Sequence, residues 1–121
     1  MNDRLFSLKT EFFVGLTTHL GNTIWYNDAI KDITYILGKN KINSFTITEA
    51  THFCKGQSEK AIIITLMHES KEPQTDDSLA EAAKKYDEIA ERLRSNFQLS
   101  ELLTTHTEVA AKLVKKEGSD V

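Results

Sequence analysis

The stretch that decides the fold is Ile42–His68, which reads INSFTITEATHFCKGQSEKAIIITLMH. Its first half, up to Cys54, alternates apolar and polar residues, which is the period-two pattern of a β-strand. The second half, Lys60–His68, is nearly continuous in apolar residues, as expected of a strand in the centre of a sheet. Lys55–Ser58 between them has the composition of a tight turn. The stretch therefore predicts an antiparallel hairpin.

Before the hairpin, the pattern predicts one strand and one helix. Residues Leu8–Thr18 alternate as a strand, and Gly21–Thr23 offers a turn with a helix N-cap. The helix is expected to end at Gly38, a residue type that favours C-caps. Its apolar stripe, expected in the core, begins with Trp25, Ala29 and Ile33.

After the hairpin, the pattern predicts a second helix and a last strand. Glu69–Asp77 is a polar loop that holds the only proline, Pro73. Ser78–Glu81 has the spacing of a capping box, which predicts that a helix begins there. Leu99–Val109 is expected to be the fourth strand. Ala110–Val121 is expected to be a lysine-rich C-terminal tail.

The predicted order, β-α-β-β-α-β, is the split βαβ or ferredoxin-like arrangement. The fold class is α+β, with a four-stranded antiparallel sheet and two helices on one face, in a single domain over residues 1–109. The open face is expected to carry Phe13 and one polar set of the second strand, Ser44, Thr46, Thr48 and His52 or their alternates. A small sheet bare on one face favours a homo-oligomer.

The composition excludes several classes of protein. The chain has 121 residues, one cysteine and a net charge of -3. A lone Cys54 cannot form an internal disulfide, and the acidic balance disfavours nucleic acid as a partner. The longest apolar run, Ala61–Ile64, is far too short for a membrane span. We therefore expect a cytoplasmic protein without membrane contact.

Residue types alone leave the chemistry open. The four histidines and Cys54 lack the spacing of a metal site, so no metal and no cofactor are expected. Glu59 and Lys60, at the start of the third strand, are best explained on residue type as an ion pair at the end of the hairpin. Phe13 and Phe53 are candidates either for core packing or for stacking on a purine.

Three segments together carry a family resemblance: Phe12–Leu16, Thr48–Ile64 and Asn96–Leu103. In order and topology they resemble the phage-encoded S-adenosylmethionine lyases, which are trimeric proteins of PII-like, ferredoxin-related fold. That family has a tyrosine late in the second strand, then a loop, then a glutamate and a lysine opening an apolar third strand. Here Phe53 stands in the place of the tyrosine, and Glu59 and Lys60 in those of the other two.

The resemblance implies a reaction and a set of site residues. The carboxylate of S-adenosylmethionine would attack its own γ-carbon, releasing methylthioadenosine and homoserine lactone. Glu59 would be the catalytic residue, while Phe13, Phe53 and Lys60 would bind the ligand. The pocket would lie between the subunits of a homotrimer, since so small a domain has no deep cleft of its own.

Two other functions remain open from the sequence. The same layout is similar to PII-like regulators, which would bind an adenine-containing ligand without reacting it. A phage-type protein-interaction module, such as an inhibitor of a host enzyme, would instead use the open face of the sheet.

Overall fold

The chain follows the predicted order of elements. The computed structural model describes residues 4–70, 75–114 and 116. Its elements are β1 (Arg4–Gly15), α1 (Tyr26–Lys39), β2 (Thr46–Cys54), β3 (Gln57–Glu69), α2 (Asp76–Asn96) and β4 (Leu103–Leu113).

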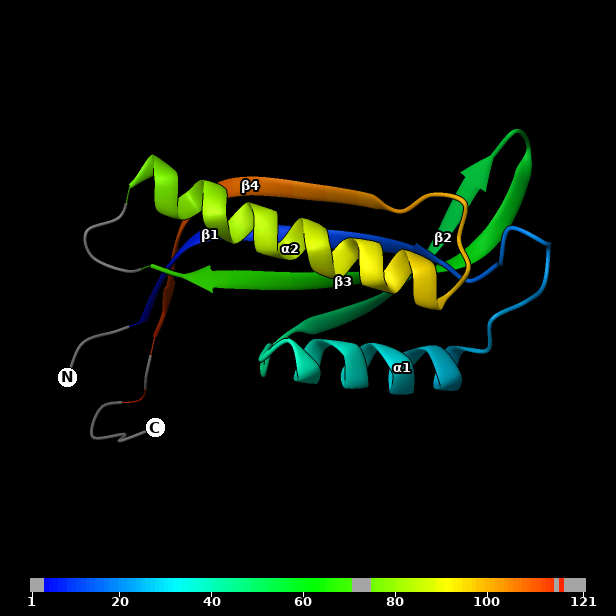
Figure 1. Ribbon diagram of the computed structural model, residues 1–121, viewed down its shortest axis with the longest axis horizontal. Coiled ribbons are helices and arrows are strands. Elements are labelled where there is room, and N and C mark those ends of the chain that lie inside the picture. The colour runs from blue at the N-terminus through cyan, green and yellow to red at the C-terminus, as the bar shows by residue number, and fades with distance from the viewer. Residues whose placement is uncertain (1–3, 71–74, 115, 117–121) are drawn as a thin grey trace.

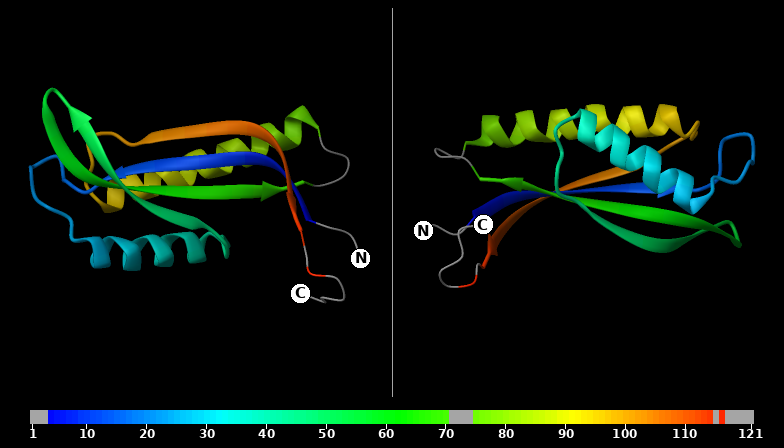
Figure 2. Two further views of the ribbon diagram at one scale, coloured as in Figure 1. Left: turned by 180° about the vertical axis from the view of Figure 1, so that it is seen from behind. Right: turned by 90° about the horizontal axis from the view of Figure 1, so that it is seen from below.

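The four strands form one antiparallel sheet in the order β2-β3-β1-β4. Both helices lie on the same face of this sheet, and the other face carries neither of them (Figure 1; Figure 2, right). The apolar strand β3 lies in the interior of the sheet beside β1, as predicted. This is the ferredoxin-like α+β arrangement, with one covered and one open face.

The core lies between the helices and the covered face. Alternate residues of the central strands, among them Phe12, Val14, Ile62 and Ile64, are fully buried there. α1 adds Ala29, Ile33 and Leu37, and α2 adds Tyr86, Ile89 and Leu93. Each fully buried large apolar side chain stabilises the fold by about 1.5–3 kcal/mol relative to exposure.

The start of α1 differs from the prediction. Trp25, not the Gly21–Thr23 turn, is the N-cap, and it makes no side-chain capping bond. Its indole lies outside the first turn and is 71% exposed. Placing Trp25 in the core was therefore wrong, whereas Ala29 and Ile33 are buried as predicted.

The end of α1 also differs, because the helix runs through Gly38 to Lys39. The left-handed position is taken by Lys41, with φ 64°. The Lys41 N–H donates to Gly38 O, and the Ile42 N–H to Leu37 O, which closes a Schellman motif. A lysine thus occupies the place for which a glycine was expected.

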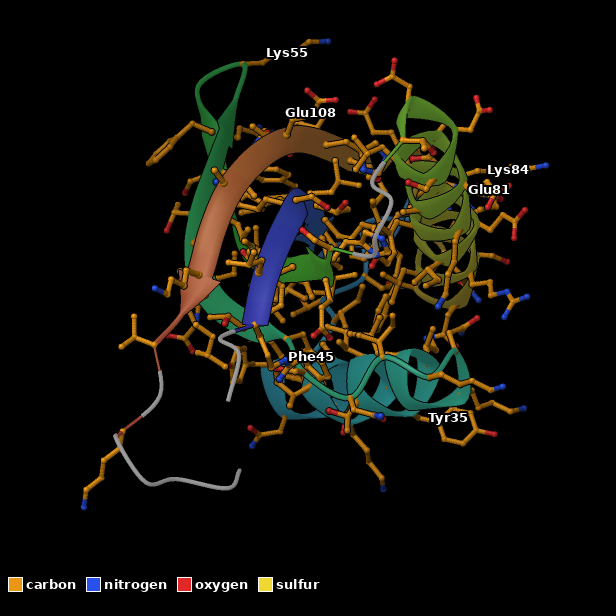
Figure 3. The ribbon with its side chains drawn as sticks, turned by 90° about the vertical axis from the view of Figure 1, so that its left-hand side faces the viewer. Tyr35, Phe45, Lys55, Glu81, Lys84 and Glu108 are labelled. Atoms are coloured by element: carbon orange, nitrogen blue, oxygen red, sulfur yellow. The ribbon has the colours of Figure 1, made fainter. Side chains whose placement is uncertain are left out.

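The capping box of α2 lies three residues earlier than predicted. Thr75 Oγ1 accepts from the Ser78 N–H, and Ser78 Oγ accepts from the Thr75 N–H, each at 3.1 Å. Ser78 is thus the N3 residue of the capping box, and Thr75 is the N-cap. Glu81 points outward from the helix (Figure 3). Pro73 lies outside the described residues.

β4 begins and ends four residues later than predicted, so residues 110–113 of the expected tail belong to the strand. A register shift between Phe6 and Leu8 interrupts the pairing of β1 with both neighbours. Residues 99–102, expected to be strand, connect α2 to β4 instead. This connection becomes part of the site described next.

Candidate functional site

A row of small residues crosses the open face. Ala61 of β3 pairs with Ala50 of β2 on one side and with Gly15 of β1 on the other. The next row along the strands is bulkier, since Phe13 pairs there with Ile63 and with Leu103 of β4. The small row therefore forms the floor of a hollow, and the bulky row forms one of its edges.

The hollow has a volume of about 840 Å³, within the range of about 300–1,000 Å³ that is usual for small-molecule sites. The sheet supplies its floor, and two connections supply a wall. These connections are residues 17–19, after β1, and residues 99–102, before β4. The same end of the sheet carries the β2–β3 hairpin, whose tip extends past both helices (Figures 1 and 2).

Glu59 places a carboxylate directly over the small row. A Cβ atom built on Gly15 would lie 2.8 Å from Oε1 of Glu59. The carboxylate therefore lies across the backbone of β1 in space that only a glycine leaves free. His52 is the cross-strand partner of Glu59 and lines the hollow beside it.

The wall of the hollow is built on the end of α2. Gln98 adopts a left-handed conformation, with φ 54°, and closes a second Schellman motif through Gln98 N–H to Ser95 O and Leu99 N–H to Arg94 O. The Gln98 carbonyl then accepts from the backbone N–H of His19 at 2.9 Å and lies 2.8 Å from His19 Nδ1. One carbonyl thus joins the two connections that make the wall.

Arg94 holds the same connection from the helix side. Its Nη1 donates to Leu99 O at 2.9 Å, while Nε and Nη2 donate a bidentate pair of hydrogen bonds to the Glu91 carboxylate. This hydrogen bonding lowers the pKa of Glu91 below its ordinary value. Arg94 therefore anchors the last turn of α2 to the chain segment that borders the hollow.

The structure brings together two of the residues that the sequence singled out. Phe13 and Glu59 both line the hollow. Phe53 and Lys60 lie on the opposite face of the hairpin, where they pair with Ser58 and Thr51 respectively. Phe53 is 73% exposed. Because Glu59 and Lys60 are consecutive in a strand, they point to opposite faces, and the expected ion pair between them is not formed.

The sequence analysis missed Gly15 and His19. A glycine inside a strand pattern is a signal of close approach to the backbone, and Gly15 carried that signal. No local pattern marked His19, because its partner Gln98 lies at the far end of the chain. In the described part of the chain, no cluster of three or more His, Cys, Asp or Glu residues could hold a metal ion.

The fold and the hollow define a ferredoxin-like α+β domain with a ligand-sized site on its open face. Solved structures of phage SAM lyase share this fold. The complex of that enzyme with S-methyl-5'-thioadenosine aligns with a TM-score of 0.60 and 18% identity, covering 93% of each chain. The apo enzyme aligns with a TM-score of 0.61 and 16% identity, covering 94% of each chain.

No protein-family model matches the chain, and no curated protein matches it in sequence. Because no sequence match accompanies it, the likeness to phage SAM lyase is one of fold.

Neither helix of the described residues is long and apolar enough to cross a membrane.

Proposed function

We propose that this chain binds S-adenosylmethionine in the hollow and cleaves it to methylthioadenosine and homoserine lactone. The observation that carries the proposal is the Glu59 carboxylate lying over Gly15 inside a hollow of small-molecule size. The fold shared with phage SAM lyase, one structure of which holds S-methyl-5'-thioadenosine, supports the same reaction.

The reaction is an intramolecular displacement. A carboxylate oxygen of the substrate forms a bond to the γ-carbon, the bond from that carbon to sulfur breaks, and its electron pair goes to sulfur. The negative carboxylate and the positive sulfonium both become neutral, so charge and atoms balance within one molecule. Holding the methionine chain folded removes much of the entropic barrier.

Glu59 suits the substrate ammonium better than the sulfonium. The sulfonium charge disappears in the transition state, so a carboxylate against it would stabilise the bound substrate more than the transition state. The ammonium keeps its charge throughout. An ion pair between Glu59 and the ammonium would therefore fix the reacting conformation without opposing the displacement.

The apolar edge of the hollow supports the same reaction. Phe13, Ile63 and Leu103 form one side of the site. A poorly hydrated surface there would favour loss of charge from the carboxylate and the sulfonium. Phe13 would pack against the adenine or the sulfonium.

We assign Phe53 and Lys60 to a site shared between copies in a homotrimer. Each lies on the far side of its own hairpin from the hollow, and the tip of that hairpin extends past the helices (Figure 1). The exposed Phe53 ring would then contact the ligand bound to a neighbouring copy. Sedimentation equilibrium measures the number of subunits, and a monomer would contradict this assignment.

The decisive experiment incubates the purified protein with S-adenosylmethionine and separates the products by chromatography. We expect methylthioadenosine from the wild type and a loss of about tenfold to a hundredfold with Glu59→Gln, because a hydrogen bond to a charged group contributes about 1.5–3 kcal/mol. Glu49→Gln is the matched control, because Glu49 is an exposed carboxylate of β2 on the other face. It should retain activity.

The other outcomes are equally informative. Binding of S-adenosylmethionine without any product would indicate that the chain is a PII-like, non-catalytic ligand-binding protein. Absence of both binding and turnover would contradict a small-molecule function and favour a protein-interaction module.

A further inference from the structure

We infer that His19 is a specificity-determining residue of the hollow, presenting a hydrogen-bond acceptor to a neutral N–H or O–H group on the nucleoside half of the ligand. This inference rests on the proposed function. It assigns a recognition role to a residue remote in sequence from Glu59.

The position of His19 is fixed at two points. Both its backbone N–H and its ring nitrogen Nδ1 contact the carbonyl of Gln98, at 2.9 and 2.8 Å. The Schellman motif at the end of α2 orients that carbonyl. The imidazole is exposed, yet its orientation is set by the backbone of two joined connections rather than by solvent.

The contact with Gln98 also fixes the tautomer. A carbonyl oxygen has no proton to give, so His19 Nδ1 must be the donor. In the neutral imidazole, Nε2 then carries a lone pair and is an acceptor. Among the residues that the structure describes, Nε2 of His19 has no hydrogen-bond partner, and His19 is one of the residues that line the hollow.

The acceptor complements the charge of Glu59. A carboxylate is suited to the cationic end of the ligand, and a neutral imidazole nitrogen to an uncharged donor. The nucleoside half of S-adenosylmethionine offers such donors in the 6-amino group and the two ribose hydroxyls. Since His19 lies on the wall and Glu59 on the floor, one ligand can engage both residues.

The experiment compares three proteins with four ligands. The proteins are wild type, His19→Phe, which keeps a ring without an acceptor, and His19→Gln, which restores an amide oxygen at about the reach of Nε2. Calorimetry measures the binding of methylthioadenosine and of its analogues that lack the 6-amino group, the 2'-hydroxyl or the 3'-hydroxyl. Turnover of S-adenosylmethionine is followed in parallel.

We expect His19→Phe to bind methylthioadenosine about fivefold to tenfold more weakly, the loss of one neutral hydrogen bond. Its KM should rise by a similar factor with kcat little changed, and His19→Gln should recover most of the affinity. The wild type should discriminate against one analogue by the same factor, and His19→Phe should lose that discrimination. The analogue affected identifies the donor as the amine or a hydroxyl.

Three results would overturn the inference. If His19→Phe binds and turns over ligand as the wild type does, His19 has no such role, while the proposed function stands. If His19→Phe keeps all the discrimination of the wild type, the contact lies elsewhere. If the wild type neither binds nor turns over any of these compounds, the proposed function fails together with this inference.

An NMR measurement on the free protein tests the tautomer of His19, and addition of methylthioadenosine then tests the contact. Nitrogen-15 NMR distinguishes a protonated from an unprotonated ring nitrogen. We expect the neutral His19 ring to carry its proton on Nδ1, and the Nε2 resonance to shift when methylthioadenosine is added. A ring protonated on Nε2 in the free protein would overturn the assignment.

Discussion

The two faces of the sheet use histidine in different ways. On the covered face, His106 of β4 contacts Thr10 Oγ1 through Nδ1 at 2.8 Å and Asp87 of α2 through Nε2 at 2.7 Å. Both ring nitrogens are thereby engaged in joining β1, β4 and α2. Beside the open face, in the wall of the hollow, the Gln98 carbonyl fixes one nitrogen of His19 and leaves the other without a partner among the described residues. A polar side chain fully engaged by the fold is structural, whereas one that is fixed at a single atom is available to a ligand.

The two faces of the central strands also differ in the size of their side chains. Phe12, Ile62 and Ile64 fill the covered face of the central strands and are fully buried. Gly15 and Ala61, from the same strands, leave space on the open face. Alternation thus gives each of these two central strands one surface that packs against the helices and one that borders the hollow.

The largest effect is expected from adjacent phenylalanines on opposite faces. Phe12→Ala removes a fully buried ring and should lower the free energy of unfolding by about 3–5 kcal/mol. Phe13→Ala removes a half-buried ring and should cost about 1–2 kcal/mol, while weakening the binding of methylthioadenosine. Urea unfolding and calorimetry measure the two effects. Equal losses of stability in the two variants would contradict the conclusion that only the covered face packs the core.

A smaller effect is expected from adding one methyl group to the open face. Gly15→Ala would force the Glu59 carboxylate away from the position it holds over β1. We expect turnover to fall about tenfold, equivalent to about 1.4 kcal/mol, with the fold intact, because a flexible side chain yields before the backbone does.

The matched control for that variant is Gly38→Ala, since a Cβ atom there meets nothing within 4 Å. In helix α1 it should raise stability by up to about 1 kcal/mol without changing turnover. Unchanged turnover in Gly15→Ala would show that the position of the carboxylate is not required.

The smallest effect concerns the Arg94–Glu91 pair, where α2 meets the wall of the hollow. The pKa of Glu91 is lowered by its hydrogen bonds to Arg94, so the pair stabilises the fold above the pKa of the unfolded chain. That contribution is lost as the pH falls through the lower folded pKa. Arg94→Gln should return the Glu91 pKa towards its ordinary value, as carbon-13 NMR titration can measure. Added salt should reduce the difference in the Glu91 pKa between the wild type and Arg94→Gln. An unchanged Glu91 titration curve in the variant would contradict the pairing.

Much of the fold could be predicted because alternation is a local signal. The pattern around Ile47 and Thr48 assigned the two faces of β2, and the apolar run after Lys60 placed β3 in the interior of the sheet. Helix ends were harder, because neighbouring residues compete for the same role. Thr75 and Ser78 both have capping side chains, and in the structure the earlier one is the N-cap while Ser78 completes the capping box.

The candidate site could be predicted only in part. Glu59 and Phe13 came from a family resemblance, and both line the hollow. The contribution of His19 depends on the carbonyl of Gln98, which lies 79 residues further along the chain. Such a contact between distant segments leaves no mark in the local sequence.

The strand order has a consequence for synthesis of the chain on the ribosome. β1 emerges first, yet Phe12 pairs with Ile64 on one side and with Thr104 on the other. The β2–β3 hairpin joins neighbouring segments and can form early, whereas β1 must wait for strands made later. The edge of β1 that pairs with β4 thus stays exposed to chaperones and to other nascent chains until β4 has left the exit tunnel.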